Sequence, residues 1–229
     1  CASVSNKKWF QFTNHIFEET DDGVFLRNKI SDLVEHYGAM GSKIFGQLAV
    51  EKDKISETSM KKRLEMIQKV IHNLKSSPFK RCVMMEAADI FYDKRFIAKL
   101  DMDPYLIAFQ NGIYDLKLDI FRAGKPEDYI SKALPINYVI FSEDDDAVHD
   151  VYDFFEKVFP DKSVREYFMD QASDVFVGGN HEKVVNFWTG SGDNAKSITQ
   201  ELFEGMMGKL AIKFNTSVIT GKAVQSGGA

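Results

Sequence analysis

Apolar residues recur every three or four positions in two stretches of the first half of the chain. In residues 25–37 this spacing predicts an amphipathic helix, and Gly38 stands where a helix C-cap is expected. Residues 57–76 repeat the pattern with their apolar side chains on one stripe, and Pro78 follows the expected end of that helix. The two stretches therefore predict two amphipathic helices.

Strand patterns lie before and after these helices. The opening segment KKWFQF places aromatic residues in alternation, and with the turn at Asp22-Gly23 it predicts a strand or two before the first helix. Between residues 105 and 118, Asn111-Gly112 separates two short β-rich runs, which is the strongest local signal for a hairpin. A further strand is expected near residues 136–141.

The second half begins with a change of composition. The acidic segment SEDDDAVHD starts at residue 142, and we place a domain boundary there. Helices are predicted over residues 146–158 and 163–177, with Pro160 between them. The apolar run KVVNFW then predicts a strand that leads into a glycine-bearing loop.

This strand, loop and following helix have the layout of a phosphate-binding loop, G-x-x-x-x-G-K-[ST]. Gly190 opens the turn, Lys196 would reach the β- and γ-phosphates of ATP, and Ser197 would ligate Mg²⁺. A helix is expected from Lys196 to Met207, with its N-terminus aimed at the phosphates. The predicted nucleotide-binding residues are Gly190, Ser191, Gly192, Asp193, Asn194, Ala195, Lys196 and Ser197, with Lys196 as the catalytic residue and Ser197 as the metal ligand.

Chance is the alternative explanation of this match. A relaxed form of the pattern should occur in a chain of this length about two times in a hundred. The required strand before it and helix after it lower that frequency several-fold, which favours a real phosphate loop.

Ala195 departs from the pattern, because glycine is expected before the lysine. If this position needs a conformation that only glycine adopts easily, alanine is costly there. If the residue already lies near helical geometry, alanine costs little. The sequence leaves both alternatives open.

Charge is distributed unevenly along the chain. The net charge of −5 argues against a uniformly basic coat for nucleic acid, yet residues 51–100 are basic and residues 141–170 are acidic. The basic side chains could line a DNA path, or they could be the solvated face of a helix. They are Lys54, Lys61, Lys62, Arg63, Lys69, Lys75, Lys80 and Arg81.

Cysteine and hydropathy exclude several other classes of protein. With only Cys1 and Cys82 there is no disulfide framework, no Cys/His cluster has zinc spacing, and a reducing compartment fits best. No apolar run approaches the roughly 20 residues of a membrane span, so no membrane association is expected. Because the chain begins with cysteine and ends in the polar tail GKAVQSGGA, we expect it to be a piece of a longer polypeptide.

An ATPase needs more than a phosphate loop. It also needs a strand that ends in acidic residues, a polar sensor and an arginine supplied in cis or in trans. The residues after Ser197 contain no apolar strand that ends in Asp or Glu. We therefore expect this chain alone to be inactive in hydrolysis.

Three motifs in order resemble those of the primase-helicases of large cytoplasmic DNA viruses and of satellite-phage primases. The first is the Trp-aromatic opening, and the second runs from DMDPYLIAF through the Asn-Gly-aliphatic-Tyr-Asp-Leu pattern to PEDY. The third joins the Phe-Pro-Asp helix to a loop similar to that of superfamily 3 helicases, Gly-x-Gly-x-Asn-Gly-Lys-Ser. The residues of the second motif in register are Asn111, Gly112, Tyr114, Asp115, Leu116, Phe121, Arg122, Pro126, Asp128 and Tyr129.

The resemblance, nearest to the poxvirus and asfarvirus proteins, implies an architecture and a function. It implies an α+β accessory domain over residues 1–140, a helical collar over 141–180, and the first part of an α/β P-loop ATPase core, AAA+-like, over 181–229. The implied protein is an ATP- and Mg²⁺-dependent hexameric DNA helicase, fused to a primase, that works with other replication proteins in the host cytoplasm.

Two other functions stay open at this stage. One is a non-catalytic DNA-binding and oligomerisation module whose phosphate loop has degenerated. The other is a small phosphotransferase, for which the long N-terminal half has no evident use.

Overall fold

The computed structural model describes residues 8–179, 183–190, 192, 194–215, 217 and 221. Serine 191 and aspartate 193 of the predicted phosphate loop lie outside the described residues. The chain divides into two compact units, one of Cys1–Gln11 with Glu18–Lys99 and one of Phe12–Phe17 with Leu100–Ala229. Residues 100–140 thus belong to the same unit as the helices that follow the acidic segment, while the domain roles expected for residues 1–140, 141–180 and 181–229 stay predictions.

The chain opens with a two-stranded sheet of β1 (Lys8–Thr13) and β2 (Ile16–Asp21), as predicted, and the turn end of this hairpin, Phe12–Phe17, is counted with the second unit. Asn14 and His15 join the strands with φ of 49° and 71°. Positive φ at both central residues is the geometry of a type I′ turn, whose twist matches that of a hairpin.

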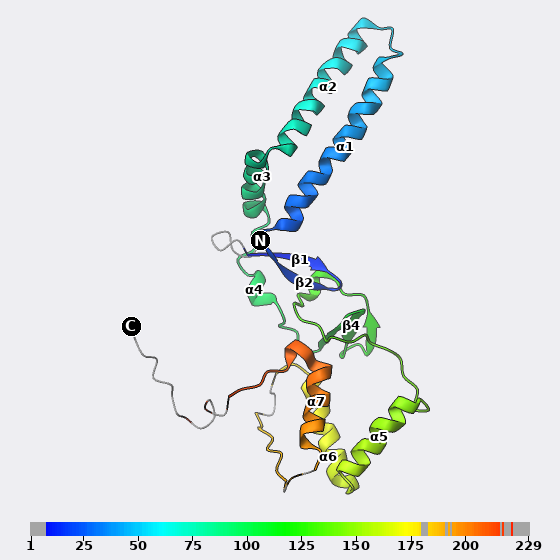
Figure 1. Ribbon diagram of the computed structural model, residues 1–229, viewed down its shortest axis with the longest axis vertical. Coiled ribbons are helices and arrows are strands. Elements are labelled where there is room, and N and C mark those ends of the chain that lie inside the picture. Colours follow the sequence, from blue (N-terminus) through cyan, green and yellow to red (C-terminus); the bar gives the residue numbers. More distant parts are fainter. Residues whose placement is uncertain are drawn as a thin grey trace. The chain divides into compact units, whose positions relative to one another are not determined.

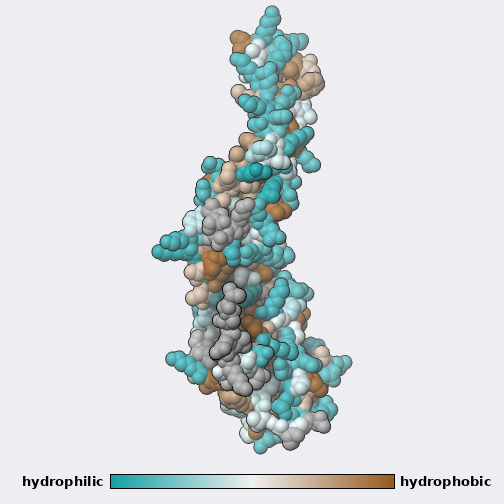
Figure 2. All heavy atoms as spheres, turned by 60° about the vertical axis from the view of Figure 1, so that its left-hand side comes forward, coloured by the Kyte–Doolittle hydropathy of each residue, from teal (hydrophilic) through white to brown (hydrophobic). Residues whose placement is uncertain are grey.

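Four helices follow in the first unit, and α1 and α2 run side by side as a long antiparallel pair (Figure 1). Their bounds are α1 Val24–Leu48, α2 Lys54–Lys75, α3 Ser77–Ile90 and α4 Phe96–Lys99. The Asp53 carboxylate caps α2 by accepting from the Ser56 N–H at 2.9 Å. The α1–α2 end of the face shown in Figure 2 is mainly hydrophilic, with hydrophobic residues scattered among the polar ones.

The expectation that the first helix ends at Gly38 is wrong. The helix continues to Leu48 because its later turns pack on α2: a Cβ at Gly41 would lie 3.5 Å from Ile67 and 3.7 Å from Leu64. This close approach of two helices outweighs the modest propensity cost of a glycine within a helix.

The core of the first unit joins the hairpin to the helices. Its buried members are Trp9, Ile30, Leu74, Met84, Ala87 and Ala88. Gly23 precedes α1 with φ of 63°, and a Cβ there would lie 3.1 Å from the Trp9 ring and 2.8 Å from the Met84 methyl group. The Asp22-Gly23 turn thus positions α1 against the Trp9 ring, because only glycine combines this φ with this space.

The second unit contains an antiparallel sheet in the order β3–β4–β5, with β3 at Leu106–Phe109, β4 at Gly112–Asp115 and β5 at Ile120–Arg122. The predicted hairpin is confirmed. Phe109 pairs with Gly112, so Gln110 and Asn111 are the loop residues. A Cβ at Gly112 would lie 2.6 Å from the Phe121 ring and 2.7 Å from the Arg122 carbonyl, which explains glycine at this position.

The strand expected near residues 136–141 does not form. Residues 134–138 instead run along β3 with only two backbone bonds, from Leu134 N to Ala108 O at 2.8 Å and from Gln110 N to Ile136 O at 3.0 Å. Asn111 adds two side-chain bonds to the Tyr138 backbone, at 2.9 and 2.8 Å. An asparagine amide thus replaces part of a strand ladder.

The later helices match the predictions closely. They are α5 Asp146–Val158, α6 Lys162–Ser173 and α7 Lys196–Met207, with short 3₁₀ turns η1 at Pro126–Asp128, η2 at Asp174–Phe176 and η3 at Gly208–Leu210. Two glycines tie them to the residues around the sheet. The Gly178 N–H donates to the Pro104 carbonyl at 2.8 Å, and a Cβ at Gly208 would lie 2.9 Å from the Pro135 ring.

The strand predicted for KVVNFW is also absent, since residues 183–190 have no regular secondary structure. A strand needs a hydrogen-bonded neighbour, and no strand of the described residues pairs with this segment. Its large apolar side chains are consequently exposed, with Val185 at 75% and Phe187 at 81%.

Candidate functional site

The predicted phosphate loop meets the start of α7 at Ala195. This residue is the N-cap of the helix and has φ of 58° and ψ of 10°, in the left-handed region. Its carbonyl accepts two hydrogen bonds from Thr199, one from the N–H at 2.9 Å and one from the hydroxyl at 3.0 Å. Thr199 is only 2% exposed, so the last residue of the loop is fixed to the first turn of the helix.

Three of the predicted residues come together beside this turn. The Lys196 ammonium donates to the Asn194 side-chain oxygen at 2.5 Å. A Cβ at Gly190 would lie 1.7 Å from the Asn194 amide nitrogen and 2.7 Å from the Lys196 Nζ. A side chain at position 190 would therefore displace the ends of these two side chains. Gly192 has φ of 112°, and Ser197 is exposed in the first turn of α7.

The start of α7 has backbone donors that the helix itself does not use. Thr199 N–H is the first to bond within the helix, so the N–H groups of the preceding turn have no helical acceptor. Ala195 has no side-chain acceptor with which to cap them. A helix N-terminus whose first N–H groups have no helical acceptor, with a lysine beside it, is the arrangement that binds phosphate in nucleotide sites.

The conformation of Ala195 answers the question that the sequence left open. The position adopts positive φ, which an L-residue with a Cβ reaches at a cost of about 1–2 kcal/mol. We expect Ala195→Gly to raise the free energy of unfolding of this unit by about 1 kcal/mol, measured by urea denaturation. Ala172→Gly, in the regular helix α6, should lower it by about the same amount. A loss of stability in Ala195→Gly would contradict the assigned conformation.

A cavity of about 580 Å³ lies beside the loop. Asn194, Lys196 and Thr199 form its polar wall, and residues of α5, α6 and the segment before the loop form the rest. This volume is within the range of small-ligand sites, and a mainly apolar wall with a few polar groups is typical of them. The lining side chains outside the loop are Val158, Phe159, Val164, Tyr167, Phe168, Gln171, Val185, Asn186, Phe187, Trp188 and Thr189.

An aromatic cluster centred on Phe168 of α6 supports this cavity. The Phe168 ring lies 4.6 Å from Phe159, 5.4 Å from Trp188 and 6.2 Å from Phe203 of α7, between ring centroids. A fourth contact, with Phe155 of α5, is 5.6 Å long. The cluster joins α5 and α6 to the segment before the loop, through Trp188, and to α7 after the loop, through Phe203. The sequence pattern did not reveal this role.

The PEDY part of the second motif forms an ion pair rather than a reactive site. The two terminal guanidinium nitrogens of Arg122 each donate to one carboxylate oxygen of Asp128 at 2.8 Å. Arg122 Nη2 also lies 3.6 Å from Asp115 Oδ2. The Lys125 N–H donates to Asp128 at 2.7 Å, which closes the η1 turn. A bidentate pair of this kind fixes the geometry of both residues.

The NGIYDL part of the motif is likewise explained by folding. Asn111 holds residue 138 against the sheet, and Gly112 fits under Phe121. The buried Asp115 carboxylate accepts from the N–H groups of Lys117 and Leu118 at 3.1 and 3.2 Å, which stabilises the turn after β4. These residues maintain the sheet, so their place in the motif reflects structure.

The Asp128 ion pair predicts a pH dependence of stability. Partial burial would raise the pKa of this carboxyl, but the hydrogen bonds from Arg122 and Lys125 outweigh it and hold the pKa below its ordinary 3.8. The contribution to stability is therefore complete above pH 3.8 and is lost as the pH falls through the lower folded value. Urea unfolding measured across acidic pH should show this loss in the parent, and Asp128→Asn should remove this component. An unchanged acid profile in that variant would contradict the pairing.

Two further findings limit the chemistry of the described residues. Among them, no group of three or more His, Cys, Asp or Glu side chains could hold a metal ion. No helix of the described chain is long and apolar enough to cross a membrane.

Comparison with known proteins places the chain in a family. The model of the family described as "D5 N terminal like" matches residues 1–176, which is most of the chain. The chain belongs to the D5 N terminal like family. The matched residues include the hairpin, the helices α1–α6 and the sheet β3–β5, and they end before the phosphate loop.

Relatives of this D5 N terminal like chain occur in several large DNA viruses. A protein of Acanthamoeba polyphaga mimivirus named "Putative helicase" is 38% identical over the whole chain, and one of Invertebrate iridescent virus 3 with the same name is 44% identical over 67% of it. A protein of African swine fever virus named "Putative primase" is 25% identical over 70% of the chain. The resemblance to the N-terminal region of viral primase-helicases is thereby confirmed.

The relatives are much longer than this chain. The matched regions span 24% of the mimivirus protein and 17% of each of the other two. The names of the relatives therefore describe proteins that are several times longer than the matched segment.

Proposed function

We propose that this chain is the accessory segment, the helical collar and the beginning of the ATPase core of a viral primase-helicase that uses ATP and Mg²⁺ to unwind DNA. The observation that carries the proposal is the meeting of Gly190, Asn194 and Lys196 at the N-terminus of α7. The family membership and the names of the relatives support it, because a phosphate loop alone is common to many reactions.

The residues present fit a bound nucleotide. Lys196 would be the cation for the β- and γ-phosphates, and the first N–H groups of α7, which have no acceptor within the helix, would be donors to phosphate oxygens. The Ser197 hydroxyl would be the protein ligand for Mg²⁺, and the Asn194 amide and the Lys196 ammonium lie in the space that a Cβ at Gly190 would otherwise enter. Bound Mg²⁺ would neutralise the charge that develops on the transferred phosphoryl group.

The ring is part of the same proposal. In a hexamer each nucleotide site lies between two subunits, and an arginine of the neighbour completes it. Such a motor would act on single-stranded or forked DNA with other replication proteins at a viral replication site in the host cytoplasm. The exposed apolar side chains of residues 184–188 fit a core that the full-length protein completes.

Calorimetry with the purified full-length protein tests the nucleotide site. We expect ATP to bind in the presence of Mg²⁺ and to bind much more weakly when EDTA removes the metal. A protein that shows no magnesium-dependent affinity for ATP would overturn the proposal.

A second candidate function rests on Ala195. An alanine held at positive φ where the helicase loop has glycine favours a weakened loop, and hence a non-catalytic DNA-binding and oligomerisation module. Ala195→Gly separates the two candidates. Gain of ATP affinity from an undetectable level in this variant supports the module, whereas measurable affinity in the parent supports the motor.

A further inference from the structure

The first unit carries a positive charge that the second does not. It has 17 Lys and Arg residues against 13 Asp and Glu, a net charge of +4, whereas the second has 12 against 21, a net charge of −9. A polyanion would therefore be attracted to the first unit, although the whole chain is acidic.

A groove of about 860 Å³ lies along α3 in this unit. Its floor is the buried Trp9, and Arg27, Lys80 and Arg81 are its basic side chains. Asp22, also in its wall, is paired with Arg27 at 2.6 Å, and Asp89 lies toward the other end of α3. Lys80 is positioned by a hydrogen bond to the Ser31 hydroxyl at 2.9 Å. The cations thus gather toward the start of α3.

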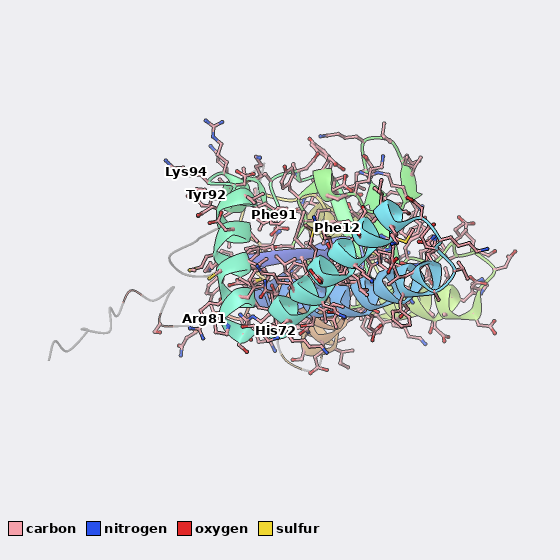
Figure 3. All side chains as sticks on the ribbon, turned by 90° about the horizontal axis from the view of Figure 1, so that it is seen from above. Phe12, His72, Arg81, Phe91, Tyr92 and Lys94 are labelled. Atoms are coloured by element: carbon pink, nitrogen blue, oxygen red, sulfur yellow. The ribbon has the colours of Figure 1, made fainter. Side chains whose placement is uncertain are left out.

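One side of α3 continues this groove. Arg81 and Met85 are four residues apart in α3, so they lie on one helical face, and Tyr92 and Lys94 follow the end of the helix at Ile90. Figure 3 shows Arg81 near the start of α3, with Tyr92 and Lys94 beyond its end on the same side. Met85 is 59% exposed and Tyr92 is 48% exposed. Within the described part of the chain, no carboxylate forms an ion pair with Arg81 or Lys94.

A groove with cations at one end and the exposed Met85 in its wall, followed by the exposed Tyr92 ring past the end of α3, matches the chemistry of an unpaired nucleic-acid strand. Phosphates bind to Lys and Arg, while bases stack on aromatic rings, a contact that a duplex does not offer because its bases already stack on each other. The helix is about 21 Å long, which is long enough for several contacts with one strand.

We propose that the α3 surface, defined by Arg27, Lys80, Arg81, Met85, Tyr92 and Lys94, binds single-stranded DNA. The inference deepens the proposed function, on which it rests for the identity of the nucleic acid as DNA. It assigns contact with the strand to the first unit and not to the nucleotide-binding loop, so the two sites can be tested separately.

The test uses the full-length protein without nucleotide and a fluorescently labelled oligothymidine, with binding followed by anisotropy over a series of salt concentrations. Removal of two phosphate contacts in the double variant Arg81→Gln and Lys94→Gln should make the negative slope of log K against log salt shallower by about 1.4. Tyr92→Ala should weaken binding about tenfold at every salt concentration, because it removes a stacking contact and no charge. A duplex of the same length should bind more weakly than the single strand.

The matched control removes the same charge elsewhere in the unit. Lys43→Gln with Lys52→Gln changes two exposed lysines near the α1–α2 connection and should keep the affinity and the salt slope of the parent. Far-UV circular dichroism verifies that every variant is folded.

Three results would overturn the inference: a parent that does not bind oligothymidine, α3 variants that bind it like the parent, or a control that loses as much affinity as they do. The inference would also be overturned if the α3 variants lost self-association but bound DNA like the parent. That result would instead assign the α3 surface to contact with the acidic second unit of another copy. A failed nucleotide-binding test with intact effects on DNA binding would reject the motor and leave this inference standing.

Discussion

Lys196→Ala is expected to lower DNA-stimulated ATP hydrolysis by the full-length protein at least about a hundredfold. The Lys196 ammonium lies at the start of α7, beside Asn194 and Gly190, where the terminal phosphates of a nucleotide would be held. Removing it takes away a charge that acts where negative charge develops during phosphoryl transfer. The measurement is kcat/KM for ATP with and without single-stranded DNA.

Two further variants make this result specific. Lys196→Arg retains the positive charge but not the compact ammonium group, so it should restore only part of the activity. Lys209→Ala changes an exposed lysine in η3, beyond the far end of the same helix, and should leave hydrolysis unchanged. A Lys196→Ala protein as active as the parent would sink the motor proposal.

The second large effect is expected from Phe168→Ala. This side chain is 9% exposed and contacts the rings of Phe155, Phe159, Trp188 and Phe203. Its removal leaves a cavity among them and should lower the free energy of unfolding of the second unit by about 3–5 kcal/mol. Urea denaturation followed by tryptophan fluorescence measures this, because Trp188 reports on the cluster itself.

Phe187→Ala is the matched control for this variant. The same type of side chain, one residue before Trp188, is 81% exposed, so its loss should change stability by no more than about 0.5 kcal/mol. Equal effects of the two variants would show that the cluster around Phe168 is not a core. If Phe168→Ala is folded at low temperature, its affinity for ATP should also be lower, since the cluster positions one wall of the loop cavity.

Local patterns predicted those elements whose stability is mainly local. The apolar stripe predicted a helix over residues 57–76, and α2 spans Lys54–Lys75. Asn111-Gly112 predicted the β3–β4 hairpin. The end of α1 could not be predicted, because its later turns, at Gly41 for example, pack on a helix that lies later in the sequence. Such long-range contacts override the local signal of Gly38.

The strands predicted at residues 136–141 and 183–188 do not form, for a related reason. Both segments have β-rich composition, but a strand exists only where another strand bonds to it. Residues 134–138 obtain part of such bonding from β3 and from the Asn111 amide, whereas residues 183–188 have no paired strand among the described residues. Composition alone does not contain this information.

The candidate site was predictable in its residue types and not in its supports. The motif pointed to Lys196 and Gly190, and their proximity is seen in the structure. Thr199, which fixes the Ala195 carbonyl, had a signal only in its position four residues after the loop, where a side-chain hydroxyl can bond back along a helix. The roles of Arg122 and Asp128 required the structure, because an ion pair and a reactive pair look alike in sequence.

The segment beside β3 has a consequence for solubility. A sheet edge with unpaired N–H and C=O groups is a template for pairing with other chains, and proteins commonly cover or interrupt such edges. Leu134 and Ile136 occupy bonds on the β3 edge, and Pro135 between them has no N–H to offer to a further strand. The Asn111 amide extends this cover to Tyr138. The small sheet is thereby protected on this side from strand addition, which matters for a chain that would be crowded against identical copies in a ring.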